Sequence, residues 1–161
     1  MDSRLKALIG AAVLLVVTVV IVLVAQGGGD DSSSSADLED LSQKPVIEVP
    51  DGDPPTKLVS DDIVEGDGAE AKTGDNLTVE YVGVDYATGE EFDTSWGKEP
   101  FQFQLGSGNV IPGWDQGLVG MKVGGRRELT IPPDLAYGAQ GSGPIGPDAT
   151  LIFVIDLTAI G

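Results

Sequence analysis

Hydrophobic and polar residues alternate along three short stretches in the C-terminal two thirds of the chain. The alternation covers residues 77–83, 101–105 and 127–131, and it is typical of strands that bury one face. Residues 151–157 are almost continuously apolar, which predicts a strand at the centre of a sheet. Because Gly, Pro and Asp residues lie between these stretches, tight turns are expected to join the strands.

One short helix is predicted within this strand-rich region. It fits over residues 114–119, between Gly113 and Gly120, since glycine commonly ends helices. Short strands, turns and one brief helix over residues 57–161 predict an α+β domain that is mainly β. Its expected form is a curved antiparallel sheet, a half-barrel, wrapped over the helix.

Residues 1–26 show a different pattern. Residues 7–25 carry no charge and are mostly Val, Leu, Ile and Ala. As a helix they would extend over about 28 Å, close to the thickness of the bilayer hydrocarbon core. Arg4 and Lys6 precede this run and acidic residues follow it. The positive-inside rule therefore predicts a signal-anchor, a single transmembrane helix of the cell membrane with the C-terminal domain extracytoplasmic.

A cleaved signal peptide is the alternative interpretation of the same residues. Ala25-Gln26-Gly27 offers a small-x-small cleavage site, and cleavage there would yield a secreted protein. The uncharged run is longer than the ~7–15 residues typical of a signal-peptide core, which favours the anchor. A lipoprotein anchor is excluded because the chain has no Cys.

Residues 27–56 are expected to form a disordered acidic spacer. They begin with glycines and serines and continue with prolines among acidic residues. Gly/Ser-rich chain is flexible, and low hydrophobicity with net negative charge favours disorder. All Phe, Tyr and Trp residues lie between positions 81 and 153. Since aromatic rings dominate core energetics, no packed core is expected before about residue 57.

Composition excludes several kinds of chemistry. The chain has no Cys and no His, so it has no disulfide, Cys nucleophile, imidazole base, Ser-His-Asp triad or Cys/His zinc site. Its net charge of −17 speaks against binding nucleic acid. No metal and no cofactor are predicted. Residues 141–146 match G-x-G-x-x-G, but prolines at 144 and 147 oppose the helix that a dinucleotide site requires.

The C-terminal domain carries an ordered series of motifs. They read VEYVG (79–83), GEEFDTS (89–95), PFQF (100–103), LGSGNVIPGWD (105–115), GLVGMKVGGRR (117–127), IPP (131–133), LAYG (135–138) and ATLIF (149–153). This series closely resembles the FKBP-type peptidyl-prolyl cis-trans isomerases, the immunophilins that bind rapamycin-like macrolides. The resemblance extends over residues 73–157.

The resemblance implies a shallow apolar pocket between the sheet and the helix. The substrate-binding residues that it implies are Tyr81, Phe92, Asp93, Phe101, Val110, Ile111, Trp114, Tyr137, Ile145 and Phe153. The expected catalytic residues within this set are Tyr81, Asp93, Tyr137 and Phe153. Trp114 would form the floor, and the Ile111 N–H and the Tyr137 hydroxyl would donate hydrogen bonds to ligand carbonyls.

The chain departs from the family pattern at two loops. Between Asp93 and Pro100 it is slightly shorter, and Lys98 is the candidate for a basic partner of the aspartate. The loop after Tyr137 is also short, and residues 145–147 read Ile-Gly-Pro where the family usually has Ile-Pro-Pro. Both loops bear on macrolide affinity and substrate preference.

Rotation about a prolyl bond suits this composition, because it requires no nucleophile, metal or general base. The barrier of ~18–20 kcal/mol comes from C–N resonance, and an apolar pocket with a few donors can bind the rotated amide better than the planar one. The prediction is a monomeric isomerase that accelerates X-Pro isomerisation in exported, proline-containing polypeptides outside the cytoplasmic membrane. A non-catalytic proline-peptide binding or chaperone module that uses the same pocket is the alternative.

Overall fold

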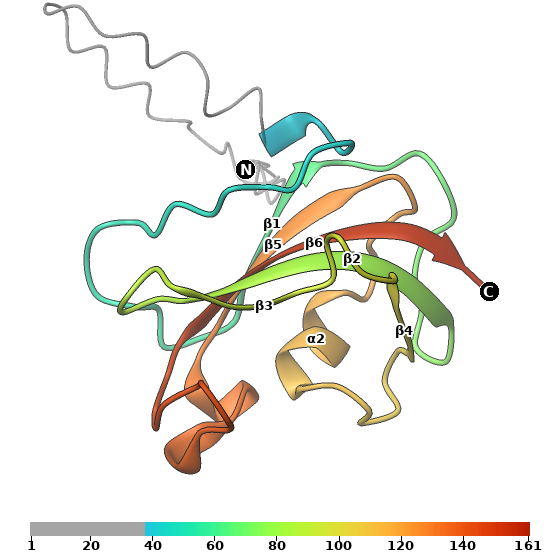
Figure 1. Cartoon of the computed structure of the whole chain (residues 1–161). Helices are drawn as coiled ribbons and strands as arrows, with labels where there is room; N and C mark the ends of the chain where they lie inside the picture. Colours follow the sequence, from blue (N-terminus) through green and yellow to red (C-terminus); the bar gives the residue numbers. More distant parts are fainter. Residues whose placement is uncertain (1–37) are drawn as a thin grey trace, which may run out of the picture. The chain divides into compact units, whose positions relative to one another are not determined.

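The structure is a computed structural model that describes residues 38–161 (Figure 1). The predicted membrane segment over residues 1–26 and the first part of the predicted spacer lie outside the described residues. Within residues 38–161, every helix is too short or too polar to cross a bilayer.

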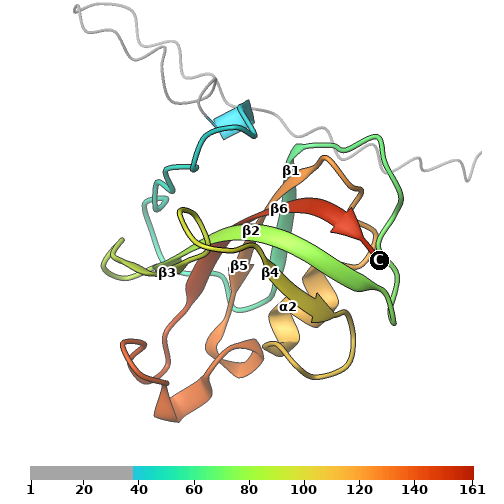
Figure 2. The ribbon, with the colours of Figure 1, turned by 45° about the vertical axis from the view of Figure 1, so that its right-hand side comes forward.

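Six antiparallel strands form one open sheet in the order β1-β5-β6-β2-β3, and β4 also pairs with β2 (Figures 1 and 2). The strands are β1 (Val59–Val64), β2 (Asn76–Asp85), β3 (Glu91–Thr94), β4 (Phe101–Gln104), β5 (Arg126–Ile131) and β6 (Leu151–Ile160). β4 pairs with the beginning of β2 and β3 with its end. β6 pairs with β5 on one side and β2 on the other, which confirms the predicted central strand.

Helix α2 (Pro112–Gly117) lies against one face of the sheet, and the strands curve over it (Figure 1). Its glycines permit this close packing. A Cβ on Gly113 would come within 2.5 Å of the Ile131 side chain, and one on Gly117 within 2.7 Å of Leu129. Two short 3-10 helices, Pro133–Leu135 and Gly138–Gln140, lie between β5 and β6. The mainly β fold with one short helix is therefore confirmed.

Arg127 of β5 holds the C-terminal end of α2. Its Nη1 donates to the Gly117 carbonyl at 2.9 Å, and its Nε lies 2.6 Å from a carboxylate oxygen of Asp62 on β1. A guanidinium placed at the end of a helix complements the unpaired carbonyls there. The contact fixes the helix beneath the sheet.

Residues 38–56, which we call the strap, differ from the predicted disordered spacer. The strap runs across the face of the sheet opposite α2 (Figures 1 and 2). Ile47 and Val49 pack against a buried cluster on that face. The members of the cluster are Val82, Val84, Tyr86 and Ile152. Both faces of the sheet are therefore covered, one by α2 and the other by the strap.

Arg126 of β5 anchors the strap. Its side chain is fully buried and pairs with Asp156 at distances of 2.6 and 2.7 Å. The guanidinium also donates to the carbonyls of Leu38 at 2.7 Å, Asp40 at 3.3 Å and Gln43 at 3.0 Å. A guanidinium has five N–H donors, so each of them has an acceptor here.

The beginning of the strap thus supplies three of the five acceptors of this buried cation, and buried donors without an acceptor are unfavourable. Composition alone indicated disorder, since it does not reveal a cation placed by a distant strand. We propose that the folding unit includes residues 38–56 and does not begin at residue 57.

Candidate functional site

Nine of the ten pocket residues expected from the sequence surround one cavity of about 220 Å³. These nine are Tyr81, Phe92, Asp93, Phe101, Val110, Ile111, Trp114, Tyr137 and Phe153. They come from β2, β3, β4, β6, α2, the loop before α2 and the segment between the two 3-10 helices. The fold therefore gathers residues that span most of the domain sequence.

Trp114 has aromatic neighbours on several sides. Its ring centroid lies 5.2 Å from that of Tyr81 and 5.2 Å from that of Phe153, with both pairs edge-to-face. The Trp114 side chain is only 4% exposed, whereas Phe101 and Tyr137 are 38% and 39% exposed. Trp114 thus contributes to the core as well as to the cavity, and the more exposed rings stand at the rim.

Gly83 of β2 makes room for two of these rings. A Cβ at this position would lie 2.7 Å from Phe92 and 2.7 Å from Phe153, well inside contact distance. The two rings pack edge-to-face with centroids 5.5 Å apart. The glycine of the VEYVG motif therefore has a specific structural role, which is to let Phe92 and Phe153 meet over the strand.

Asp93 and Tyr81 form the polar pair of the cavity. The Tyr81 hydroxyl donates to Asp93 Oδ2 at 2.6 Å, and the Thr94 N–H donates to Asp93 Oδ1 at 2.9 Å. Burial raises the pKa of the Tyr81 phenol, and the hydrogen bond to Asp93 raises it further. The phenol is therefore a stable hydrogen-bond donor, and the carboxylate is held in one orientation.

Two further donors have no acceptor within the described part of the chain. Neither the Tyr137 hydroxyl nor the Ile111 N–H has a hydrogen-bond acceptor among residues 38–161. Burial raises the pKa of the Tyr137 phenol, and the negative charge of Asp93 acts in the same direction. Both groups belong to residues that line the cavity, so they are available to a carbonyl of a bound molecule.

Ile145 is the expected residue that the cavity does not include. It is 8% exposed and belongs to the core on the α2 face. Its N–H and carbonyl pair with the carbonyl and N–H of Ser142, both at 2.9 Å. This tight turn in the short loop directs Ile145 into the core.

Asn109 also lines the cavity, although it was not predicted as a site residue. It is a single polar residue between Gly108 and Val110, and nothing in this local pattern indicates a role in binding.

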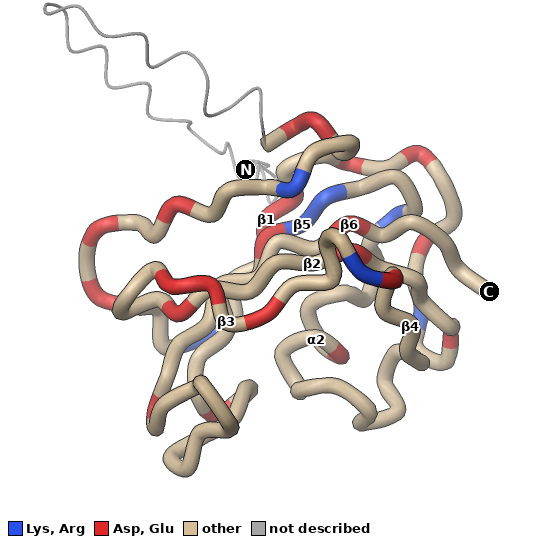
Figure 3. Tube along the Cα trace, viewed as in Figure 1, with Lys and Arg blue, Asp and Glu red and all other residues tan. Residues whose placement is uncertain are grey.

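Lys98 is not the partner of Asp93 in this structure. Over the described part of the chain, the ion pairs involve other lysines and arginines. Acidic residues instead lie along β3 and in the turn before it (Figure 3). Glu90, Glu91 and Asp93 account for this acidic stretch. Of these three, only Asp93 lines the cavity, because Glu91 pairs with Lys44 of the strap.

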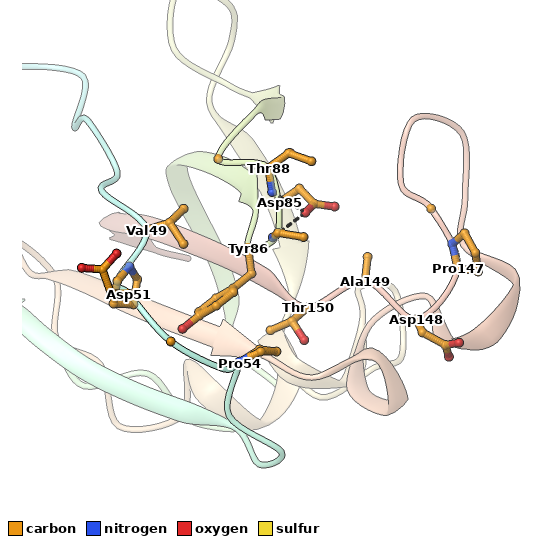
Figure 4. A pocket seen from close by; sticks show the side chains of 15 residues that line it. Val49, Asp51, Pro54, Asp85, Tyr86, Thr88, Pro147, Asp148, Ala149 and Thr150 are labelled. Carbon is orange, nitrogen blue, oxygen red and sulfur yellow. Dashed lines mark hydrogen bonds between the residues drawn. The ribbon is translucent and has the colours of Figure 1, made fainter.

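A larger cavity of about 540 Å³ lies elsewhere, between the strap, the turn after β2 and the residues before β6 (Figure 4). Tyr86 is the single aromatic residue of its lining, and its hydroxyl contacts the Asp53 carbonyl at 3.5 Å. The Asp85 carboxylate accepts the Ala87 N–H at 2.7 Å. Because these walls are mostly turns and prolines, the smaller aromatic cavity is the better site for an apolar ring.

The described residues contain no group of three or more acidic side chains arranged to hold a metal ion. The aromatic cavity offers an apolar enclosure, one carboxylate and a few neutral donors. Such a site can bind and orient an apolar group beside an amide, and it can do so without covalent chemistry.

Comparison with known proteins agrees with this geometry. Residues 68–158 match the family described as FKBP-type peptidyl-prolyl cis-trans isomerase. The chain is 58% identical over 121 residues to the FK506-binding protein of Streptomyces anulatus, which covers 73% of this chain and 98% of that protein. It is 54% identical over 116 residues to the probable FK506-binding protein of Corynebacterium glutamicum, with 71% and 97% covered.

A solved structure has the same fold. The crystal structure of AtFKBP13 superposes with a TM-score of 0.62 at 38% sequence identity, covering 67% of this chain and 96% of that one. The family match includes every residue of the aromatic cavity. This chain belongs to the FKBP-type peptidyl-prolyl cis-trans isomerase family.

Proposed function

We propose that this chain accelerates cis–trans isomerisation of X-Pro bonds in the aromatic cavity. The observation that carries the proposal is the combination of an apolar enclosure around Trp114 with free donors at Ile111 and Tyr137. A proline ring fits such an enclosure, and its preceding carbonyl then meets the donors.

Catalysis in this site is differential binding of the rotated amide. The planar amide is stabilised by resonance, which must be lost at the top of the barrier. Removing water from the amide weakens its polar planar form, and donors placed for the rotated carbonyl stabilise the transition state. The Asp93 carboxylate, fixed by Tyr81 and Thr94, adds a constant field at the rim without exchanging a proton.

The same cavity is proposed to bind macrolides of the FK506 and rapamycin type. Two of the relatives are named FK506-binding proteins, and a macrolide with an apolar ring beside a carbonyl presents the same chemistry as a prolyl peptide. Substrate and macrolide should therefore compete.

Proline-limited refolding of a model protein separates catalysis from mere binding. Chain 38–161 at catalytic concentration should accelerate the slow phase, which otherwise takes tens of seconds. An excess of FK506 should abolish the acceleration. If the chain binds a proline-containing peptide but leaves the slow phase unchanged, the alternative of a non-catalytic binding module is correct instead.

The rate should be nearly independent of pH between about 6 and 9. The pKa values of Tyr81 and Tyr137 are raised above the ordinary ~10 of a phenol, so both hydroxyls stay protonated and keep donating throughout this range. The chain has no His or Cys that would titrate there. We expect kcat/KM to be flat over this interval. A bell-shaped profile centred near neutrality would mean that a side chain transfers a proton, contrary to the mechanism above.

We propose further that the domain works outside the cytoplasmic membrane on exported polypeptides. The uncharged run over residues 7–25, with basic residues before it and acidic residues after it, supports this. The intact protein should fractionate with membranes, and protease added to the outside of intact cells should release the domain. A protein found in the cytosolic fraction and protected from this protease would contradict the proposal. Recovery only from the medium would favour a cleaved signal peptide.

A further inference from the structure

The residues that follow Asp93 hold the backbone of Tyr81 on both of its polar groups. The Tyr81 N–H donates to Ser95 Oγ at 2.9 Å. The Tyr81 carbonyl accepts from the Ser95 N–H at 3.1 Å and from Thr94 Oγ1 at 2.8 Å. The β2–β3 pairing starts only at Val82 opposite Thr94. At the residue that carries the cavity phenol, two side-chain hydroxyls therefore bind the β2 backbone in addition to the Ser95 N–H.

The Ser95 hydroxyl has a defined direction. Ser95 is 4% exposed, and its Oγ donates a hydrogen bond to the Glu80 carboxylate. A hydroxyl has one hydrogen and two lone pairs. Donation to Glu80 therefore leaves the lone pairs free to accept the Tyr81 N–H.

The Glu80 carboxylate in turn relies on Ser95 for a hydrogen bond. In the β2–β6 register Glu80 lies opposite Asp156, and the Asp156 charge is already paired with Arg126. Among residues 38–161, Ser95 is the one hydrogen-bond donor to the Glu80 carboxylate. Two carboxylates face each other across the strands, so a donor on the Glu80 side favours the arrangement.

We propose that Ser95 is a positioning residue for the reaction, which sets the Tyr81–Asp93 pair at the rim of the cavity. Tyr81 is attached to residues 93–95 at three points, namely its N–H, its carbonyl and its hydroxyl. Loss of the Ser95 hydroxyl removes one of these and releases Glu80. The inference rests on the proposed isomerase function, because small displacements of positioning groups reduce rates strongly.

A double-mutant cycle on kcat/KM tests this inference. Ser95→Ala should lower kcat/KM roughly 5- to 10-fold, the effect of one ordinary hydrogen bond. In a Tyr81→Phe background the same replacement should lower it by less than about twofold, because the hydroxyl that Ser95 positions is already absent. Equal losses in the two backgrounds would show that Ser95 acts independently of Tyr81, and would overturn the proposal.

Amide hydrogen exchange tests the geometry without any activity. In Ser95→Ala the Tyr81 amide should exchange at least about 10-fold faster than in the unaltered chain, since its acceptor is gone. An unchanged Tyr81 exchange rate would overturn the proposal. If Ser95→Ala does not fold, the nearly isosteric Ser95→Cys, whose thiol is a weak acceptor, should show the same two effects.

Thr158→Val is the matched control. It also removes a hydroxyl that bonds to the β2 backbone, in this case the Thr78 carbonyl at 3.0 Å, but it does so away from the cavity. It should leave kcat/KM and the hydrogen-exchange rate of the Tyr81 amide unchanged. A similar fall in kcat/KM and a similar rise in that exchange rate in this control would contradict a specific role for Ser95. If the unaltered chain lacks isomerase activity, the proposed function fails, while Tyr81 exchange still decides whether Ser95 holds the backbone.

Discussion

A chain that begins at Lys57 should be less stable than one that begins at Leu38, by on the order of 3 kcal/mol in free energy of unfolding. Without the strap, Arg126 loses three carbonyl acceptors, and the apolar cluster of β2 and β6 that Ile47 and Val49 cover meets water. The conformational entropy that the strap regains offsets part of this loss. Domains of this size are stable by only about 5–15 kcal/mol, so the loss is a large fraction of the total.

Urea unfolding of the two chains, followed by tryptophan fluorescence, measures this difference. Lys44→Met in the longer chain is the matched control, because it removes only the exposed Lys44–Glu91 ion pair. Exposed pairs of this kind contribute about 0–1 kcal/mol, so the control should unfold close to the unaltered chain. Equal unfolding midpoints for the chains from Lys57 and Leu38 would show that the strap is dispensable.

Replacing Phe92 and Asp93 together by Ala should lower kcat/KM by about 100-fold. Phe92 forms one wall of the cavity, and Asp93 holds the Tyr81 hydroxyl. Both lie on the short strand β3, where Phe92 is half-buried and Asp93 is exposed, so the fold should be retained. Trp114→Ala is a poorer test, because loss of a buried ring in a core costs about 3–5 kcal/mol and would confuse stability with activity.

Glu91→Ala provides the control for the double replacement. Glu91 lies on the same strand, but its carboxylate pairs with Lys44 of the strap instead of facing the cavity. It should keep turnover near that of the unaltered chain. Unaltered turnover in the Phe92→Ala, Asp93→Ala chain, with both proteins folded, would mean that catalysis occurs elsewhere.

Strands β2, β4, β5 and β6 could be predicted from the sequence, whereas β1 and β3 could not. In β4 and β5 the apolar residues Phe103, Leu129 and Ile131 lie in the core and alternate with more polar residues, which produces the periodic pattern. β1 reads VSDDIV and is mostly exposed, and β3 has only four residues. Strands that bury so few residues show no clear alternation, so the positions of β1 and β3 depend on their neighbours.

Neither the order of the strap nor the membership of the cavity could be predicted from local sequence patterns alone. Ile47 and Val49 are spaced as in a strand, but prolines and acidic residues around them indicated disorder. The residue that fixes the strap, Arg126, comes 83 to 88 positions after the three strap residues whose carbonyls it binds. The cavity aromatics could be assigned by resemblance to a family, whereas alternation alone gave no reason to separate them from the core. Ile145 lies in the core and does not line the cavity, because a tight turn, which the sequence motif does not reveal, sets its position; its contact with a substrate stays a prediction.

NMR exchange spectroscopy on a short X-Pro peptide tests the central claim most directly, because it detects interconversion of the cis and trans forms at equilibrium. Chain 38–161 at substoichiometric concentration should produce cis–trans exchange cross-peaks on a time scale of a second or less, far faster than the tens of seconds of the uncatalysed process. Saturating FK506 should remove the cross-peaks. Peptide signals that broaden on binding, without any exchange between the cis and trans forms, would show that the aromatic cavity binds proline and does not catalyse its isomerisation.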